Sequence, residues 1–132
     1  MSGAEDYAAL AMVAERKKLH ALADFAQKHR RDACLTAEIA RLASMLAKES
    51  DAATPGDVSA AIALQQYASV AARRSDRLLA EKRALAPDLE QARKEAMRAS
   101  GRVDAIEILA SRQRAEERHR RARQTERMMI GL

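Results

Sequence analysis

Few residues in this chain have types and spacings that can do chemistry. Glu116 and His119 lie three residues apart, which is half of a di-metal site in helical bundles, but the required second copy is missing from the sequence. His20 and His29 are too far apart to share a metal on adjacent turns. Cys34 has no Cys/His constellation around it, which favours a spare or buried thiol over a nucleophile. We therefore expect no catalytic residue, no cofactor and no metal site.

Other common signatures of enzymes and of secreted or membrane proteins are absent as well. The glycines are scattered, so no phosphate-cradling loop is present, and they stand at positions 3, 56, 101 and 131. One cysteine excludes an internal disulfide, and no basic-then-apolar leader opens the chain. No apolar run reaches the roughly 20 residues that span a bilayer. We expect a cytoplasmic protein that does not enter the membrane and takes no small-molecule substrate.

The composition favours long helices over a thick core. The 132 residues include no Trp, one Phe and two Tyr, whereas the hydrophobic fraction is 48% and consists mostly of small and aliphatic side chains. Charged residues make up 33%, and only four glycines and two prolines interrupt the chain. This profile is typical of helices that pair along narrow seams. We expect an all-α fold.

The first expected helix spans about residues 6–48, where strong helix formers dominate and no Gly or Pro occurs. Its apolar residues form two stripes, with a register slip expected at residues 28–32. The stripes consist of Tyr7, Leu10, Val13, Leu19, Leu22 and Phe25/Ala26, and of Leu35, Ile39, Leu42 and Leu46.

Residues 49–56 form the expected loop, and a second helix is expected over about 57–128. We expect Thr54 to be its N-cap, with Pro55 at the first helical position and Asp57 as the acidic residue that follows. Pro87 lies inside this helix and either kinks it or divides it, in which case a three-helix bundle results. We favour a kink because the apolar register continues from Leu85 to Leu89.

An apolar repeat in alternating steps of three and four follows the loop. Its positions are 61, 64, 68, 71, 75, 78, 82, 85, 89, 92, 96, 99, 103, 106 and 110, and only Ser75 and Lys82 among them are polar. The repeat predicts a single domain, 1–132, in which two long helices form an antiparallel coiled-coil hairpin. Counting back from the loop places residue 6 opposite about residue 100. The last thirty or so residues should then overhang without an intramolecular partner.

The excess of positive charge lies in this expected overhang. The chain has a formal net charge of +5, and residues 111–132 carry seven arginines against three glutamates. These arginines either dock a partner or solvate an isolated helix through spacings such as Glu116 with Arg120 and Glu117 with Arg121. The aromatic residues of nucleic-acid modules are missing from the tail. A smaller basic run, residues 16–18, is expected on a solvent face of the first helix.

The chain combines two unequal expected helices and a short polar loop with the tail residues Leu109-x-x-Arg112-Gln113, Arg123 and Met129. In this combination it resembles the FliJ family of flagellar type III export proteins and their YscO-like injectisome counterparts. The chain departs from the family pattern after Met129, where Ile130 and Gly131 stand in place of an acidic pair.

This resemblance implies a non-enzymatic stalk in the pore of a hexameric export ATPase, at the membrane-proximal base of the apparatus, that also contacts the export gate and export chaperones. The expected partner-binding residues are Leu109, Arg112, Gln113, Arg118, Arg121, Arg123, Met128 and Met129. The alternative is a coiled-coil adaptor unrelated to secretion, whose basic tail binds an acidic protein or nucleic acid.

Overall fold

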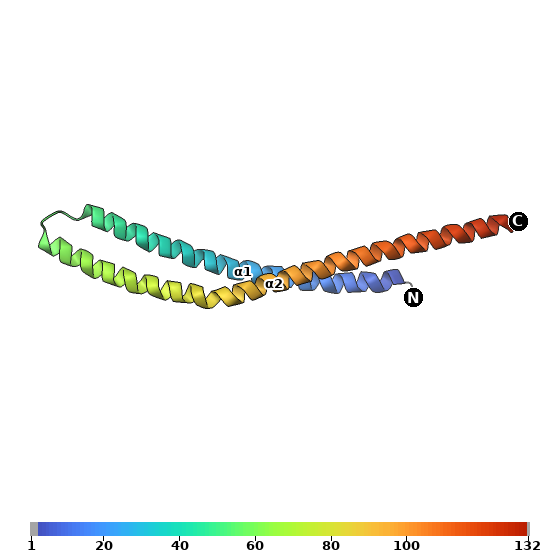
Figure 1. The fold of residues 1–132 in the computed structure, drawn as a ribbon, viewed down its shortest axis with the longest axis horizontal. Coiled ribbons are helices and arrows are strands. Elements are labelled where there is room, and N and C mark those ends of the chain that lie inside the picture. The colour runs from blue at the N-terminus through green and yellow to red at the C-terminus, as the bar shows by residue number, and fades with distance from the viewer. Residues whose placement is uncertain (1–2, 132) are drawn as a thin grey trace. The chain divides into compact units, whose positions relative to one another are not determined.

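Two helices make up nearly all of the fold. The computed structural model describes residues 3–131, with α1 at Gly3–Ala52 and α2 at Val58–Ile130. The helices pack against each other (Figure 1), and no strand occurs within residues 3–131. The expectation of an all-α fold of two packed helices is thereby confirmed.

α1 extends beyond both of its expected bounds, α2 begins one residue later and ends two residues later than expected, and α2 is continuous. It passes through Pro87, which is exposed to solvent. Proline has no N–H group, so one carbonyl in the preceding turn loses its helical partner. At an exposed position water can bond that carbonyl, and the helix survives the loss.

The connection between the helices is a tight turn that precedes the start of α2. The N–H of Asp57 donates to the carbonyl of Thr54 at 3.2 Å, and Gly56 has a φ of 87°. Pro-Gly at the centre of such a turn is the signature of type II. Asp57 then caps α2 by accepting the N–H of Ala60 at 3.2 Å. Thr54 was the expected cap, and this expectation was wrong because Pro55 and Gly56 form the turn instead.

Two glycines should respond in opposite directions to the same substitution. Gly101 lies in an exposed turn of α2, and a Cβ added there meets nothing within 4 Å. We expect Gly101→Ala to raise the free energy of unfolding by about 0.5–1 kcal/mol, because alanine favours the helix. Gly56→Ala should lower it by about 1 kcal/mol, since alanine disfavours a positive φ. Urea denaturation followed by circular dichroism measures both, and equal signs would contradict the assignment.

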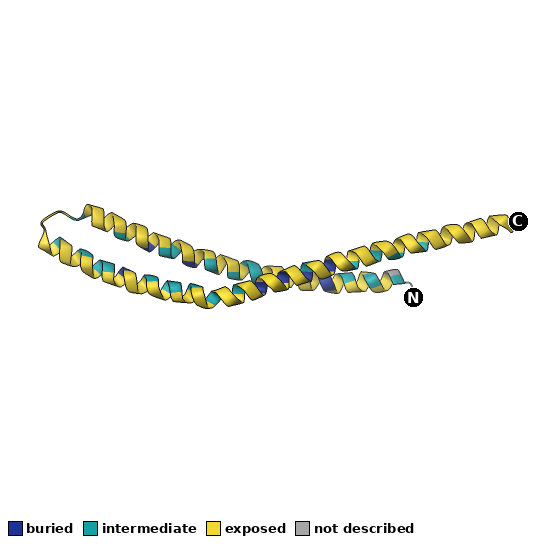
Figure 2. Ribbon diagram, in the orientation of Figure 1, coloured by how far each residue is buried: buried dark blue, intermediate teal, exposed yellow. Residues whose placement is uncertain are grey.

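The contacts divide the chain into two units, which are described separately. Unit 1 contains α1 up to Asp24 and α2 from Arg93 onward, and unit 2 is Phe25–Ala92. In each unit one stretch of α1 packs on one stretch of α2. Figure 2 shows that buried and half-buried residues line one side of each helix, while the remaining surface is exposed.

Leucines form the seam of unit 2. Leu35 and Leu42 are buried, with 2% and 8% of their surface exposed, and Ile39 and Leu46 are half-buried beside them. Ala71 and Ala92 are the buried residues of α2 in this unit. The second expected stripe of the first helix, 35, 39, 42 and 46, is therefore confirmed. Alanine on one helix leaves room for leucine from the other.

Two ion pairs fix the direction of the helices in unit 2. Arg31 contacts Glu81 at 2.9 Å, and Glu38 contacts Arg74 at 2.6 Å. The later residue of α1 thus pairs with the earlier residue of α2, so the two segments run antiparallel. All four side chains are at least one third exposed, and such pairs contribute little to stability. These ion pairs instead favour the alignment in which the oppositely charged residues of the two helices face each other.

The polar seam residue Lys82 has partners on α1. Its ammonium group donates to the hydroxyl of Thr36 at 2.6 Å and lies 3.7 Å from the carboxylate of Asp32. A polar residue in a seam favours the alignment in which it finds its partners. Lys82 therefore specifies the register of unit 2.

The expected register slip in α1 does not occur. One unbroken repeat of three and four runs along α1 with every position buried or half-buried, at 7, 11, 14, 18, 21, 25, 28, 32, 35, 39, 42 and 46. Polar residues occupy positions 18, 28 and 32 of this repeat. The prediction was wrong because it followed hydrophobicity, whereas Lys stems and small alanines take these seam positions. As a consequence Leu10, Val13 and Leu19 are more than half exposed.

Small side chains form the seam of unit 1. Its buried residues are Ala14 of α1 and Ala96, Ala99 and Val103 of α2. The expected repeat of α2 continues as half-buried residues through 106, 110, 113 and 117. It extends past residue 110, where it was expected to end.

The register of unit 1 differs from the expected one. A Cβ built on Gly3 would lie 2.8 Å from the amide nitrogen of Gln113, so residue 3 lies beside residue 113. Counting back from the loop had placed residue 6 opposite about residue 100. That count was wrong in part because α1 continues to Ala52, so the chain folds back at residues 53–57, later than expected.

Candidate protein-binding surfaces

The end of α2 is fully exposed. Every described residue from 118 to 131 is exposed, and this stretch contains Arg118, Arg121 and Arg123. Met128, Met129 and Ile130 have 74%, 70% and 85% of their surface exposed. Apolar side chains of this size on a helix without packing contacts are typical of a surface that a partner covers.

The expected binding residues lie on two different faces of α2. Successive residues of an α-helix are rotated by about 100°. One face therefore carries Leu109, Arg112, Gln113 and Arg123, and the opposite face carries Arg118, Arg121, Met128 and Met129. Gln113 is half-buried beside Gly3, so its role in unit 1 is packing. The other expected residues are all exposed.

The tail arginines are not neutralised by their own helix. Within residues 3–131, neither Glu116 with Arg120 nor Glu117 with Arg121 forms an ion pair. The hydrogen bond found here is from the hydroxyl of Thr125 to the carbonyl of Arg121, at 2.9 Å. The guanidinium groups remain available for a carboxylate or phosphate of a partner.

Unit 1 contains a second surface, an apolar groove that sequence reasoning missed. It is lined by Leu10, Val13, Ala14, Lys17, Ala99, Arg102, Ala105 and Ile106. Leu10 and Val13 were expected in the seam, but they are 54% and 52% exposed. Extending the repeat backward from Leu35 in steps of three and four would have revealed this, because it passes through Ala11 and Ala14 instead.

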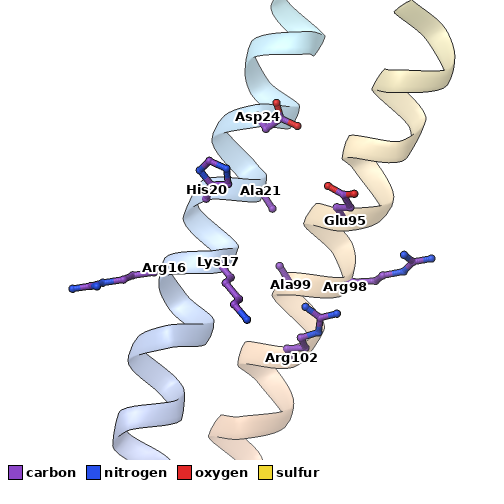
Figure 3. Close-up of a pocket in the computed structure, with 9 residues that line it drawn as sticks. All are labelled: Arg16, Lys17, His20, Ala21, Asp24, Glu95, Arg98, Ala99 and Arg102. Atoms are coloured by element: carbon purple, nitrogen blue, oxygen red, sulfur yellow. The ribbon is translucent and has the colours of Figure 1, made fainter.

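A cationic groove adjoins the apolar one and shares Lys17, Ala99 and Arg102 with it. Figure 3 shows Lys17 extending from α1 toward α2 and Arg102 lying along α2, whereas Arg16 and Arg98 point outward. None of these four cations forms an ion pair within the part of the chain that the structure describes. The expected solvent-facing run 16–18 is exposed at Arg16 and Lys17, but Lys18 is half-buried in the seam.

The residues first considered for chemistry form no metal cluster. Within residues 3–131, no three His, Cys, Asp or Glu side chains gather closely enough to hold a metal ion. Cys34 is exposed and free. Neither helix has, in its described residues, a stretch both long and apolar enough to cross a membrane.

No protein-family model matches this chain. Comparison with curated proteins and with solved structures gives no significant match either. The exposed end of α2 and the two grooves of unit 1 are therefore the basis for a functional assignment.

Proposed function

We propose that this protein is a stalk of a type III protein export apparatus, of the kind found in the FliJ and YscO-like families, and that it has no catalytic activity of its own. It forms an antiparallel coiled-coil hairpin in which the end of α2 overhangs α1. The overhang begins near residue 118, because Gly3 lies beside Gln113 and the residues after 117 are exposed.

One observation carries the proposal: the exposed end of α2 combines unpaired arginines with uncovered Met128, Met129 and Ile130. Guanidinium groups bind carboxylates in a fixed two-point geometry, and flexible methionines adapt to irregular apolar surfaces. A helix with both features suits insertion among the loops of a surrounding protein ring. The motif Leu109-x-x-Arg112-Gln113 with Arg123 and Met129 supports the same family.

The narrow seam of the helices also suits a stalk. Alanines at positions 14, 96 and 99 let the two backbones of unit 1 approach closely, which keeps the pair slim. In this role the stalk stands in the pore of the hexameric export ATPase, in the cytoplasm at the base of the apparatus, and contacts the export gate and the export chaperones.

The test is an ATPase assay with purified components. If the chain is the stalk, we expect the full chain to stimulate the hydrolysis of ATP by the export ATPase of the same organism. A chain that ends after residue 117 should keep its helix content but lose stimulation. If the full chain does not stimulate ATP hydrolysis, the proposal is refuted.

The same arginines support a second candidate, a coiled-coil adaptor unrelated to export whose tail binds an acidic protein or nucleic acid. Binding to nucleic acid falls steeply with salt, because each phosphate contact releases counterions. A DNA or RNA affinity that drops by about tenfold or more between 50 and 200 mM salt, together with no effect on the ATPase, would favour this candidate.

A further inference from the structure

The apolar groove of unit 1 has the properties of a docking site that is separate from the exposed end of α2. We propose that it binds an acidic amphipathic helix of a partner protein. Leucine side chains of that helix would contact Leu10, Val13 and Ile106, and its carboxylates would meet Lys17 and Arg102. This inference does not depend on the export role, because it concerns a different surface.

The first argument is the apolar content of the groove. Leu10 and Val13 lie one turn apart on α1 with more than half of their surface exposed, and Ile106 of α2 is half-buried beside them. The alanines at 14, 99 and 105 form the rest of the floor and leave space above it. A third helix laid in such a groove buries this area and gains about 25 cal/mol per Å² of apolar surface.

The second argument is charge. Lys17 and Arg102 both line the groove, Lys17 extends toward α2 and Arg102 lies along α2 (Figure 3), and neither forms an ion pair within residues 3–131. The corresponding heptad positions of unit 2 hold Arg31 with Glu81 and Glu38 with Arg74, which neutralise each other. Lys17 and Arg102 thus lack the ion pairs that the corresponding residues of unit 2 form, and carboxylates from a partner can provide them.

The third argument concerns the kind of partner. Asp24 and Glu95 line the far end of the cationic groove, and each already has an interaction within the chain. Two carboxylates there would repel a continuous polyanion such as a nucleic acid or an acidic membrane surface. A helix whose carboxylates lie only beside Lys17 and Arg102 is not repelled in this way. The two grooves together extend from Leu10 to Asp24, or about 21 Å of helix at 1.5 Å per residue, which matches four turns of a partner helix.

The test uses the full chain and a synthetic probe. The probe is a fluorescent amphipathic peptide of about 14 residues, or four turns, with leucine in a 3-4 repeat and flanking glutamates. We expect fluorescence anisotropy to give a dissociation constant on the order of 10 µM. A peptide with lysine in place of glutamate should bind at least about tenfold more weakly.

Matched variants locate the binding. Leu10→Glu should weaken it by about tenfold or more, whereas Leu19→Glu, at a residue of similar exposure outside the groove, should change it less than about twofold. Arg102→Ala should weaken it about fivefold, while Arg41→Ala, at an exposed cation of unit 2, should have no effect. Circular dichroism checks that each variant keeps its helix content. Arg118→Ala with Arg121→Ala, on the exposed end, should bind the peptide normally.

Several outcomes would overturn the inference. The first is that Leu10→Glu and Leu19→Glu weaken binding of the acidic peptide by the same factor. The second is that the lysine peptide binds as tightly as the acidic peptide, and the third is that the acidic peptide does not bind up to about 1 mM. Phosphatidylserine vesicles and a single-stranded RNA serve as competing probes. If either probe binds more tightly than the peptide, and Leu10→Glu abolishes this binding, the groove takes a lipid surface or a nucleic acid instead.

Discussion

Replacing Leu35 by alanine is expected to lower the free energy of unfolding by about 2–3 kcal/mol, a large part of the stability of a two-helix protein. Leu35 is 2% exposed, which makes it the most buried large side chain among residues 3–131. The substitution removes its apolar contacts and leaves a cavity in the seam. A helix pair can partly close such a cavity by moving together, so the loss should lie near the lower end of the range for leucine.

Leu19→Ala is the matched control, because it makes the same chemical change in the same helix. Leu19 is 58% exposed, and its replacement should change the free energy of unfolding by no more than about 0.5 kcal/mol. Urea denaturation followed by circular dichroism measures both variants. A loss for Leu19→Ala as large as that for Leu35→Ala would mean that the expected stripe containing Leu19 lies in the seam of α1.

The helices and most of the seam of α2 could be predicted from the sequence. Of the fifteen expected seam positions of α2, only Ala61 is exposed, and the neighbouring Ala60 is half-buried in its place. The prediction works there because the seam residues are apolar or small and no other apolar stripe competes with them. An uninterrupted 3-4 repeat of this length specifies one side of a helix.

The seam of α1 could not be predicted in the same way. Its first half carries apolar residues on several sides, and the larger ones, Leu10, Met12 and Leu19, are exposed. The seam itself passes through alanines and through Lys18, whose hydrophobicity is low. Only packing against α2 selects among these sides, and packing is not encoded in one helix alone. The apolar groove was missed for this reason.

The outer surface of α2 presents a different difficulty. The sequence identifies Arg112, Arg118, Arg121 and Arg123 as the excess charge of the tail, but charge alone does not say which of them act together. Helical rotation separates them into two faces, with Arg112 and Arg123 on one and Arg118 and Arg121 on the other. The face of Arg112 also continues that of Arg102 in the groove. A partner that approaches from one side can contact only one pair.

Alanine substitution of one arginine pair should therefore weaken binding to the proposed partner, an export ATPase, by about thirtyfold or more, and substitution of the other pair by less than about threefold. Two arginines at the centre of an interface commonly account for about 2–3 kcal/mol, whereas solvated arginines account for little. The variants are Arg112→Ala with Arg123→Ala, and Arg118→Ala with Arg121→Ala. Because all four side chains are exposed, neither variant should change the helix content. Of the two, we expect Arg118 and Arg121 to matter more, since Met128 and Met129 lie on their face and add apolar contact.

A pull-down with the purified ATPase, quantified at several protein concentrations, separates the two cases. Ile130→Ser extends the comparison to an uncovered apolar residue, and Thr125→Ala is a neutral control in the same stretch, because its hydroxyl bonds only the local backbone. Unchanged binding in both arginine variants would remove the exposed end of α2 as the ATPase contact. Equal, partial losses would instead mean that the ATPase contacts both faces of the helix.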